Sequence, residues 1–442
     1  MANSIVKKLR EDAIYLFHSG INAVLPQNLI PNNIFLRGKT LKISGINGKE
    51  KQFRLDDYER VFVIGAGKAS PAMAKEIEKI LGDKIFKGLI VTKYNFATDL
   101  KNIKIIEAGH PLPDVNGLNG SKKIINICKK ADRDDLIINL ISGGASSLLP
   151  CPTSNITLSD KIKTTQLLIE SGAAIKEINI VRKHISAIKG GKLTKYVYPA
   201  TMINIIISDV IGDDLETIGS GLTVPDPSTF KDSMEIILKY NLQDKIPDKV
   251  NIHLKKGVIT ETSKDNNTVF KNVHNFIIGN NKIALSAIMS SAKKMGYNSK
   301  IIIHNLSGSP EQAAKRIINI LDNPKSNETQ CFLFGGETEV TVKGKGKGGR
   351  NQELCLNTSG LIAGKKNVVF LSAGTDGNDG PTKAAGAICD GLTLRRAKSV
   401  GLDIRSFLDN NDSYNFFNKL NDLIITGPTG TNVMDIQILL RC

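Results

Sequence analysis

The sequence predicts an α/β protein of two domains, and three observations support this. The chain has 442 residues, which is more than one hydrophobic core usually organises. Short apolar, β-branched runs alternate with segments of helical periodicity, the pattern of parallel strands joined by helices. A polar stretch, TETSKDNNT at 260–268, is typical of a linker or a surface loop. We therefore expect one domain over residues 1–245 and a smaller one over residues 265–442.

The chain begins with an amphipathic helix, because its apolar residues from Ile5 to Val24 recur at helical spacing. Glu11 and Asp12 interrupt this segment, which excludes a secretory signal peptide and argues against an organelle transit peptide. No stretch reaches the roughly 20 apolar residues that a membrane span requires. We expect a soluble, cytoplasmic protein that does not bind membranes.

The first domain alternates strands and helices in a way that predicts a parallel sheet with helices on both faces. Helices are expected at 70–81, 117–130, 157–171 and 174–191, the first with Ser70 as N-cap and Pro71 after it. The strand candidates are RVFVIGAGK, KGLIVTKY, KIIEAGHPLPD, DLIINLISGG and MINIIISDV.

The second domain repeats this alternation. NFIIGN, KIIIHNLSG, NVVFLSAGTDG and DLIITGPTGTNVMDIQILL contain its strands, with helices at 281–296, at 309–321 and from about 350. QCFLFGGETEVTV is predicted to form two strands joined at Gly335-Gly336.

Composition disfavours two classes of site. The formal net charge is +16, but the lysines are dispersed, aromatic residues make up 5% and tryptophan is absent, so nucleic-acid binding is disfavoured. The six cysteines and six histidines show no metal-ligand spacing. The charge fits a solvated lysine-rich surface or the steering of small anions into a cleft.

Several predicted strands end in glycine-rich loops, at Gly65-Ala66-Gly67-Lys68, Ser142-Gly143-Gly144, 209–221, 344–350 and 374–380. Carboxyl ends of strands form the ligand crevice of open α/β sheets, and free backbone N–H groups there make anion nests. A single loop of this kind is usually only a turn, but several together favour a binding site.

GAGKASP is neither of the two common phosphate-binding motifs. Phe62 stands where a P-loop needs its first glycine, and Ala69 follows Lys68. Ser70 takes the third position of a dinucleotide fingerprint, and GLIVTKY lacks the acid expected about 20 residues later. Lys68 lies beside the positive end of a helix, which is unfavourable without an anion, so it is a candidate functional residue.

Acidic and basic side chains share these loops. Asp209, Asp213 and Asp214 follow a buried strand and suit Mg²⁺, although Asp213 and Asp214 also fit an Asx-rich turn. Asp376 and Asp379 occur in a similar loop and are candidates to border a nucleotide or metal. The lysines of VKGKGKGGRNQE fit either a solvated loop or a polyphosphate contact, with Arg350 placed to clamp a phosphoryl group.

Taken together, the motifs resemble those of the two-domain glycerate kinase family, whose C-terminal part is called the MOFRL domain. The resemblance runs from about residue 60 to residue 435 and rests on GAGKASPAMA, GHPLPD, LISGGASSLL, INIVRKHISAIKGGKL, SDVIGDDLETIGSGLTVPDPST, GGETEVTVKGKGKGGRNQE, TDGNDGPTKAAGA and GPTGTNVMD. It implies ATP-dependent phosphorylation of D-glycerate to 2-phosphoglycerate with Mg²⁺. It also implies a Rossmann-like N-terminal domain, a smaller α/β domain with the MOFRL region at about 330–435, and an active site in the cleft between them.

The resemblance assigns catalysis to Lys68, Asp209 and Arg350, with Asp209 as metal ligand or base. We expect Ser142, Gly143 and Gly144 to bind the glycerate carboxylate or a phosphate. Arg182 and Lys189, seven residues apart and so on one helical face, are expected to grip the same carboxylate. The remaining candidates are Gly65, Gly67, Gly348, Gly349 and Asp376 for the nucleotide, and Asp213 and Asp214 with Asp209 for the metal.

Two alternatives differ in chemistry. Proteins of this family have often carried the label of NAD(P)H-dependent hydroxypyruvate reductase, but the damaged dinucleotide fingerprint argues against that activity. A non-catalytic phosphosugar- or nucleic-acid-binding protein would use the +16 charge, but acids clustered at strand ends would repel phosphate without a metal. The oligomeric state, a homodimer included, stays open.

Overall fold

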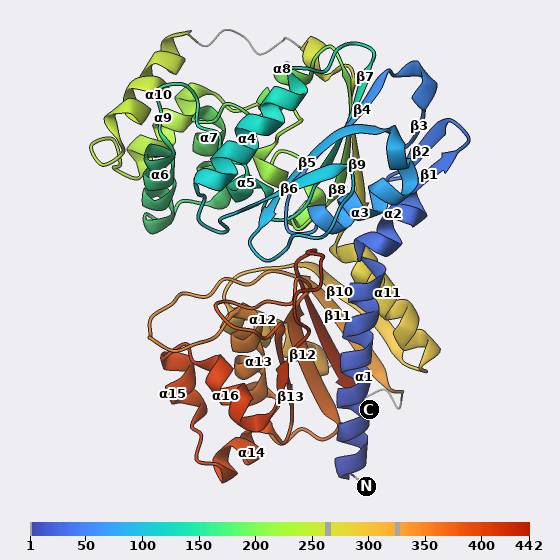
Figure 1. Cartoon of the computed structure of the whole chain (residues 1–442). Helices are drawn as coiled ribbons and strands as arrows, with labels where there is room; N and C mark the ends of the chain where they lie inside the picture. Colours follow the sequence, from blue (N-terminus) through green and yellow to red (C-terminus); the bar gives the residue numbers. More distant parts are fainter. Residues whose placement is uncertain (1, 261–266, 323–327) are drawn as a thin grey trace. The chain divides into compact units, whose positions relative to one another are not determined.

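The computed structural model describes residues 2–260, 267–322 and 328–442, and the chain forms two compact units (Figure 1). The central unit comprises residues 29–278, and the terminal unit combines residues 1–28 with 279–442. These boundaries differ from the predicted domains 1–245 and 265–442. Most of the predicted linker, residues 261–266, lies outside the described residues.

The central unit contains a six-stranded sheet in the order β6-β5-β4-β7-β8-β9, with parallel pairing from β6 to β8. When the six strands are renumbered along the chain, this order is 3-2-1-4-5-6, the order of dinucleotide-binding sheets. The direction in which successive strands are added reverses between β4 and β7, which is the switch point of the sheet. The strands are β4 (Arg60–Ala66), β5 (Ile85–Lys93), β6 (Ile103–Ala108), β7 (Asp135–Ile141), β8 (Thr201–Ile207) and β9 (Val273–Gly279). The predicted Rossmann-like parallel sheet is therefore confirmed.

The longer helices α3 (Ser70–Leu81) and α4 (Val115–Cys128) pack directly on this sheet. Helix α3 contacts β4, β5 and β7, and α4 contacts β5 and β6. The core beneath α4 joins Phe62 and Ile64 of β4 to Ile137 of β7 and Ile124 of α4. The short helix α5 (Ala145–Leu148) follows β7, and the short helix α8 (Lys192–Val197) precedes β8.

Four further helices form a layer with its own apolar core around Leu168, Val181 and Ile237. They are α6 (Leu158–Glu170), α7 (Ile175–His184), α9 (Phe230–Lys239) and α10 (Asp248–Thr260). Helix α7 ends seven residues before the predicted end at 191. Beyond it, Ser186 bridges to Pro152, and Gly190 and Gly191 adopt left-handed backbone angles that stop a helix.

A three-stranded antiparallel sheet precedes β4 and was not predicted. It consists of β1 (Ile34–Arg37), β2 (Thr40–Ser44) and β3 (Glu50–Arg54), and it follows helix α2 (Pro26–Asn33).

The terminal unit has a mixed six-stranded sheet in the order β10-β11-β15-β12-β13-β14. Strands β10 and β11 pair in parallel, and the other neighbours pair antiparallel. The strands are β10 (Asn298–Leu306), β11 (Gln330–Gly336), β12 (Val368–Gly374), β13 (Gly386–Asp390), β14 (Leu423–Ile424) and β15 (Asp435–Arg441).

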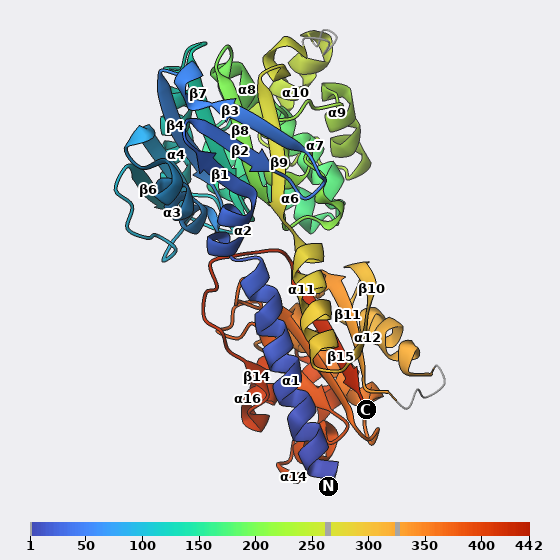
Figure 2. The same ribbon diagram turned by 90° about the vertical axis from the view of Figure 1, so that its right-hand side faces the viewer.

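Helices cover this sheet. Helices α1 (Ala2–Ala23) and α11 (Asn281–Lys294) lie side by side along it (Figure 2). The other helices are α12 (Pro310–Ile318), α13 (Arg350–Leu361), α14 (Thr393–Ser399), α15 (Ile404–Asp409) and α16 (Ser413–Leu420). No helix among the described residues is both long and apolar enough to cross a bilayer.

Two contacts explain the boundaries of the units. Helix α1 buries Leu9, Leu16 and Phe17 and packs on α11, β12 and β15, so the first residues belong to the terminal unit. Strand β9 joins the edge of the central sheet beside β8, so a strand predicted for the second domain belongs to the first unit.

The segment QCFLFGGETEVTV forms one strand, β11, not the predicted two. Gly336 has φ +138°, and its backbone is packed so tightly on Leu306 that a Cβ would lie 2.3 Å from the Leu306 carbonyl oxygen. The loop that follows, residues 337–349, forms no second strand, and several of its N–H groups donate to side chains, while Glu339 N and Gly346 N donate to the Gly308 and Asn410 carbonyls. Lys343 N donates to Asn411 Oδ1 (2.7 Å) and Lys345 N to Asn410 Oδ1 (3.0 Å).

Candidate active site

The loops after β4 and β7 are hydrogen-bonded to each other at the switch point of the central sheet. Lys68 N donates to the Gly143 carbonyl (2.9 Å), Ser142 N to the Ala66 carbonyl (3.1 Å), and Ala69 N to Ser142 Oγ (3.0 Å). Open α/β sheets bind ligands at such a point. The structure therefore brings together two predicted segments that are about 75 residues apart in the sequence.

The glycines of the β4 loop allow this close approach. Gly67 has φ +140°, and a Cβ there would lie 2.1 Å from Ser142 Oγ. A Cβ at Gly65 would lie 2.3 Å from the Leu140 carbonyl oxygen. Both glycines are thus required for packing, and nucleotide binding by them stays a prediction.

Of the residues predicted to form an anion nest, Ser142 already uses its hydroxyl within the protein, and the nest itself stays a prediction. The Ser142 hydroxyl accepts from Ala69 N and lies 3.2 Å from Ser70 Oγ, so it locks the β4 loop. Among the residues that the structure describes, no backbone hydrogen bond uses the N–H groups of Gly143 and Gly144. Gly144 has φ +89° and packs on the ring of His110, a residue that the sequence did not single out.

Lys189 fixes the turn beside this nest. It is fully buried, and its Nζ donates to the Ser146 carbonyl (2.8 Å) and hydroxyl (3.1 Å) and to the Gly219 carbonyl (3.4 Å). Ser146 Oγ lies 2.8 Å from Ser220 Oγ, which donates to Asn179 Oδ1 (3.1 Å). The sequence analysis missed this network. The GSG motif at 219–221 was a usable signal, because glycines favour the positive φ angles that Gly219, Ser220 and Gly221 adopt in this turn.

Arg182 and Lys189 do not share a helical face, because α7 ends at His184. The prediction of a common face is therefore wrong, but the two charges are close enough to interact. Burial lowers the pKa of Lys189 well below its usual value, and the charges of Lys161 and Arg182 lower it further. Burial also lowers the pKa of Lys161 to about 7, with Arg182 and Lys192 as additional causes.

The three predicted metal ligands follow β8 but differ in environment. Asp209 is half-buried directly after Ser208. Asp214 is exposed, and its carboxylate accepts from Glu216 N (3.0 Å) and Thr217 Oγ1 (2.7 Å), which is an Asx-type turn. Asp213 has φ +57° within that loop. Within the described ranges, no three His, Cys, Asp or Glu residues are grouped so that they could hold a metal ion.

Arg350 lies in the terminal unit at the start of α13 and is held by two acids. Its Nε and Nη2 donate to the two oxygens of Asp435 (2.6 and 2.9 Å), and Nη2 also donates to Glu337 Oε1 (2.7 Å). Burial opposes its charge, but Asp435 and Glu337 outweigh this and raise the pKa of Arg350.

Asp435 was missed by the sequence analysis. It is fully buried at the first position of β15, paired in register with Gly336 of β11 and Gly374 of β12. It therefore anchors Arg350 beside the carboxyl ends of these two strands.

Other predicted residues of this unit also make structural contacts. Asp379 is buried and caps α13, accepting from Asn351 N (3.1 Å) and Gln352 N (2.9 Å), while burial raises its pKa to about 6. A Cβ at Gly349 would lie 2.3 Å from Asp379 Cγ, and one at Gly348 would lie 2.3 Å from Ser413 Oγ.

Asp376 stays the more accessible candidate of its loop. It is half-buried, and its carboxylate accepts from Asn378 N (3.0 Å).

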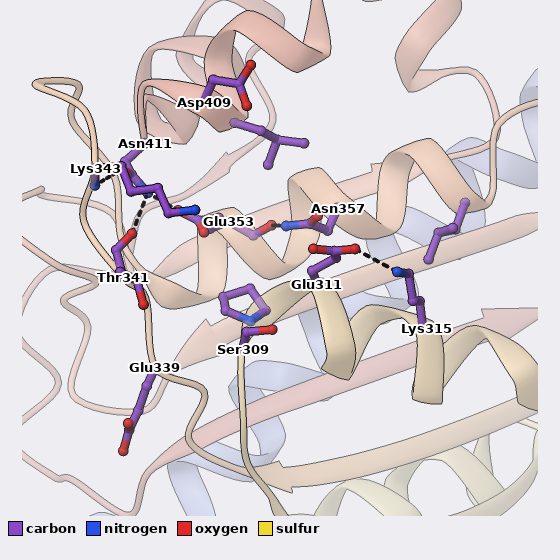
Figure 3. Close-up of a pocket in the computed structure, with 13 residues that line it drawn as sticks. Ser309, Glu311, Lys315, Glu339, Thr341, Lys343, Glu353, Asn357, Asp409 and Asn411 are labelled. Atoms are coloured by element: carbon purple, nitrogen blue, oxygen red, sulfur yellow. Dashed lines mark hydrogen bonds and ion pairs between the residues drawn. The ribbon is translucent and has the colours of Figure 1, made fainter. Parts of the chain in front are cut away.

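A pocket of about 770 Å³ in the terminal unit is lined by Lys343, one of the lysines of VKGKGKGGRNQE, but by none of the residues assigned to catalysis, substrate, nucleotide or metal (Figure 3). Four carboxylates and two lysines line it, and Lys315 pairs with Glu311 at 2.6 Å. This excess of acids is unfavourable for a triphosphate. Its acidic side chains are Glu311, Glu339, Glu353 and Asp409.

Comparison with known proteins gives two family matches and close relatives. The model of a domain of unknown function, DUF4147, matches residues 12–255, and the MOFRL family model matches residues 330–435. A Pyrococcus horikoshii protein named glycerate 2-kinase is 40% identical over 440 residues, 98% of each chain. A Thermotoga maritima protein named D-glycerate 2-kinase is 40% identical over 388 residues, 86% of this chain and 91% of its own. The crystal structure of glycerate kinase from Thermotoga maritima matches with a TM-score of 0.83 and 37% identity over 99% of this chain and 100% of that one.

Proposed function

The chain belongs to the two-domain glycerate kinase family, and we propose on this basis that it transfers the γ-phosphoryl group of ATP to D-glycerate, giving 2-phosphoglycerate and ADP. The observation that carries the proposal is the pair of loops joined at the switch point. Lys68 lies there together with the N–H groups of Gly143 and Gly144, which donate to no backbone carbonyl of the described residues, and sheets of this order bind anionic ligands at this point.

Phosphoryl transfer depends on positioning and on neutralising charge more than on covalent chemistry. We assign the neutralisation of the transferring phosphoryl group to Lys68 and Arg350. The bidentate pairing with Asp435 supports this role for Arg350, because it fixes the plane of the guanidinium before substrate arrives. Asp376 and the Gly348-Gly349 loop are proposed to border the nucleotide.

Mg²⁺ is proposed as the second cofactor beside ATP. Protein sites usually hold it with one or two carboxylates plus substrate phosphates, a ligand set that does not require a cluster of three acids. Asp209 is the candidate ligand or, alternatively, the base for the attacking hydroxyl. When bound, Mg²⁺ would neutralise phosphate charge. The turn hydrogen bonds of Asp214 favour a structural role for that residue.

The proposal is tested with Lys68→Ala and Arg350→Ala, assayed with ATP, Mg²⁺ and D-glycerate. Loss of one cation that stabilises the transition state should lower kcat by about 10² or more. Lys75→Ala and Arg395→Ala are matched controls, because both side chains are exposed. Variants that stay folded and within a few-fold of the parent would contradict these assignments.

Product analysis tests the reaction itself. Incubation with ATP, Mg²⁺ and D-glycerate should give 2-phosphoglycerate rather than 3-phosphoglycerate. Oxidation of NADH in the presence of hydroxypyruvate, without phosphorylation of glycerate, would overturn the proposal in favour of a reductase.

A further inference from the structure

Three cations of the central unit interact with one another: Lys161 and Lys189 are buried, and Arg182 is half-buried. Lys161 is on α6, Arg182 is in the last turn of α7, and Lys189 follows that helix. Lys161 is 4% exposed and Lys189 is fully buried. Within the described part of the chain, no ion pair joins any of the three to an acid, whereas neighbouring Lys183 pairs with Asp226. Buried charges in proteins are normally paired, so this arrangement needs another explanation.

The hydrogen bonds of the three side chains show which of them is available to a ligand. Lys189 donates to the Ser146 and Gly219 turns and is therefore occupied. The Nζ of Lys161 has one long contact, 3.5 Å to the Arg182 carbonyl. The guanidinium of Arg182, with five N–H donors, makes no hydrogen bond to any described residue.

We infer that Lys161 and Arg182 form an anion seat that holds the carboxylate of the acceptor substrate. The planar fork of a guanidinium suits a carboxylate held by two parallel hydrogen bonds. Lys189 connects the seat to the nest, because it interacts with both charges and donates to Ser146, two residues after Gly144. The inference rests on the proposed function and adds Lys161 to the residues expected to bind glycerate. It changes the role of Lys189 from substrate contact to positioning.

The experiment compares Arg182→Gln and Lys161→Gln in the full chain, with D-glycerate and with its neutral amide as substrates. A seat for the carboxylate predicts that KM for glycerate rises about 10-fold or more in each variant, as expected for loss of a charged hydrogen bond. KM for ATP should stay unchanged, and the preference for glycerate over the amide should fall by a similar factor. Lys163→Gln and Lys176→Gln are matched controls on the same two helices, with exposed side chains.

Two further measurements separate binding from catalysis and from folding. D-glycerate alone should raise the Tm of the parent and of the controls but not that of Arg182→Gln. Arg182→Lys keeps the positive charge but removes the planar guanidinium, so this variant should fold like the parent. Its KM for D-glycerate should lie between that of the parent and that of Arg182→Gln.

Each other outcome is decisive. Unchanged KM and preference in folded variants would overturn the seat while the kinase function stands. A rise in KM for ATP instead would mean that the cations hold phosphate, which also overturns it. If the parent does not phosphorylate glycerate, the proposed function fails, and the Tm shift with glycerate still tests the seat.

Discussion

Replacing Lys161 with methionine should stabilise the ligand-free protein. The side chain is buried among Arg182, Lys189, Lys192 and the thiol of Cys151, and its pKa is lowered from 10.5 to about 7. Since one pKa unit corresponds to about 1.4 kcal/mol, holding the charged form in the fold costs up to about 5 kcal/mol. Methionine keeps the apolar stem and removes the charge, so we expect a gain of about 2–4 kcal/mol at pH 7 after lost contacts are deducted.

The stability gained by Lys161→Met should decrease as the pH rises above 7. Between pH 7 and 10.5 the unfolded chain keeps a proton on Lys161 that the folded chain releases, so the contribution of Lys161 to the free energy of unfolding rises with pH. The advantage of Lys161→Met should therefore be largest at pH 7 and below, and it should shrink by about 1.4 kcal/mol per pH unit above that.

Scanning calorimetry at pH 7, 8 and 9 measures this effect. A gain of 1 kcal/mol raises the Tm of a unit of this size by about 2–4 °C, so a gain of about 2–4 kcal/mol should make Lys161→Met melt roughly 4–16 °C above the parent at pH 7. Lys163→Met, at an exposed position of α6, is the control and should shift little. A Lys161→Met protein that is less stable than the parent at pH 7, or a difference independent of pH, would show that Lys161 is a satisfied structural residue.

Three other substitutions test the remaining features. Asp435→Asn keeps the shape but removes the charge that holds Arg350, so kcat with ATP and glycerate should fall about 10- to 100-fold, and an unchanged kcat would refute this positioning role. Burial and nearby lysines lower the pKa of His274 to about 4, so between pH 6.5 and 4 the unfolded chain binds a proton on His274 that the folded chain does not bind, and the folded state loses stability as the pH falls. His274→Phe removes this titration, so urea unfolding should show a loss of stability between pH 7 and 4.5 that is smaller than in the parent by about 1–2 kcal/mol. Gly67→Ala would place a Cβ 2.1 Å from Ser142 Oγ, so Tm and activity should both fall sharply, and a stable, active Gly67→Ala would contradict the described contact between the two loops.

The parallel strands of the central unit could be predicted because they are buried on both faces. DLIINLI of β7 is buried at every position, so it appears in the sequence as a continuous apolar run. The small sheet β1–β3 was missed because its strands are short and partly exposed, as in the pattern of β3, where only Phe53 is buried. The Asn47-Gly48 pair between β2 and β3 was a usable hairpin signal.

The site was predicted only in part. Loop positions such as Lys68 and Arg350 follow strands or open helices, and local sequence marks them. Their partners depend on strand register and tertiary packing: Asp435 meets Arg350 from 85 residues away. Lys161 looked like an ordinary helical lysine, because burial under other helices leaves no local sequence signal.

The terminal unit is built from both ends of the polypeptide, with residues 29–278 inserted between them. During synthesis on the ribosome, the central unit can be completed while α1 still lacks α11, β12 and β15, the elements that cover Leu9, Leu16 and Phe17. The apolar face of α1 therefore stays uncovered until about 260 further residues have been made for α11 and about 410 for β15, and we expect chaperones to bind it in that interval. A fragment starting at residue 279 would lack one wall of its own core, so the MOFRL region should be expressed together with the first 28 residues.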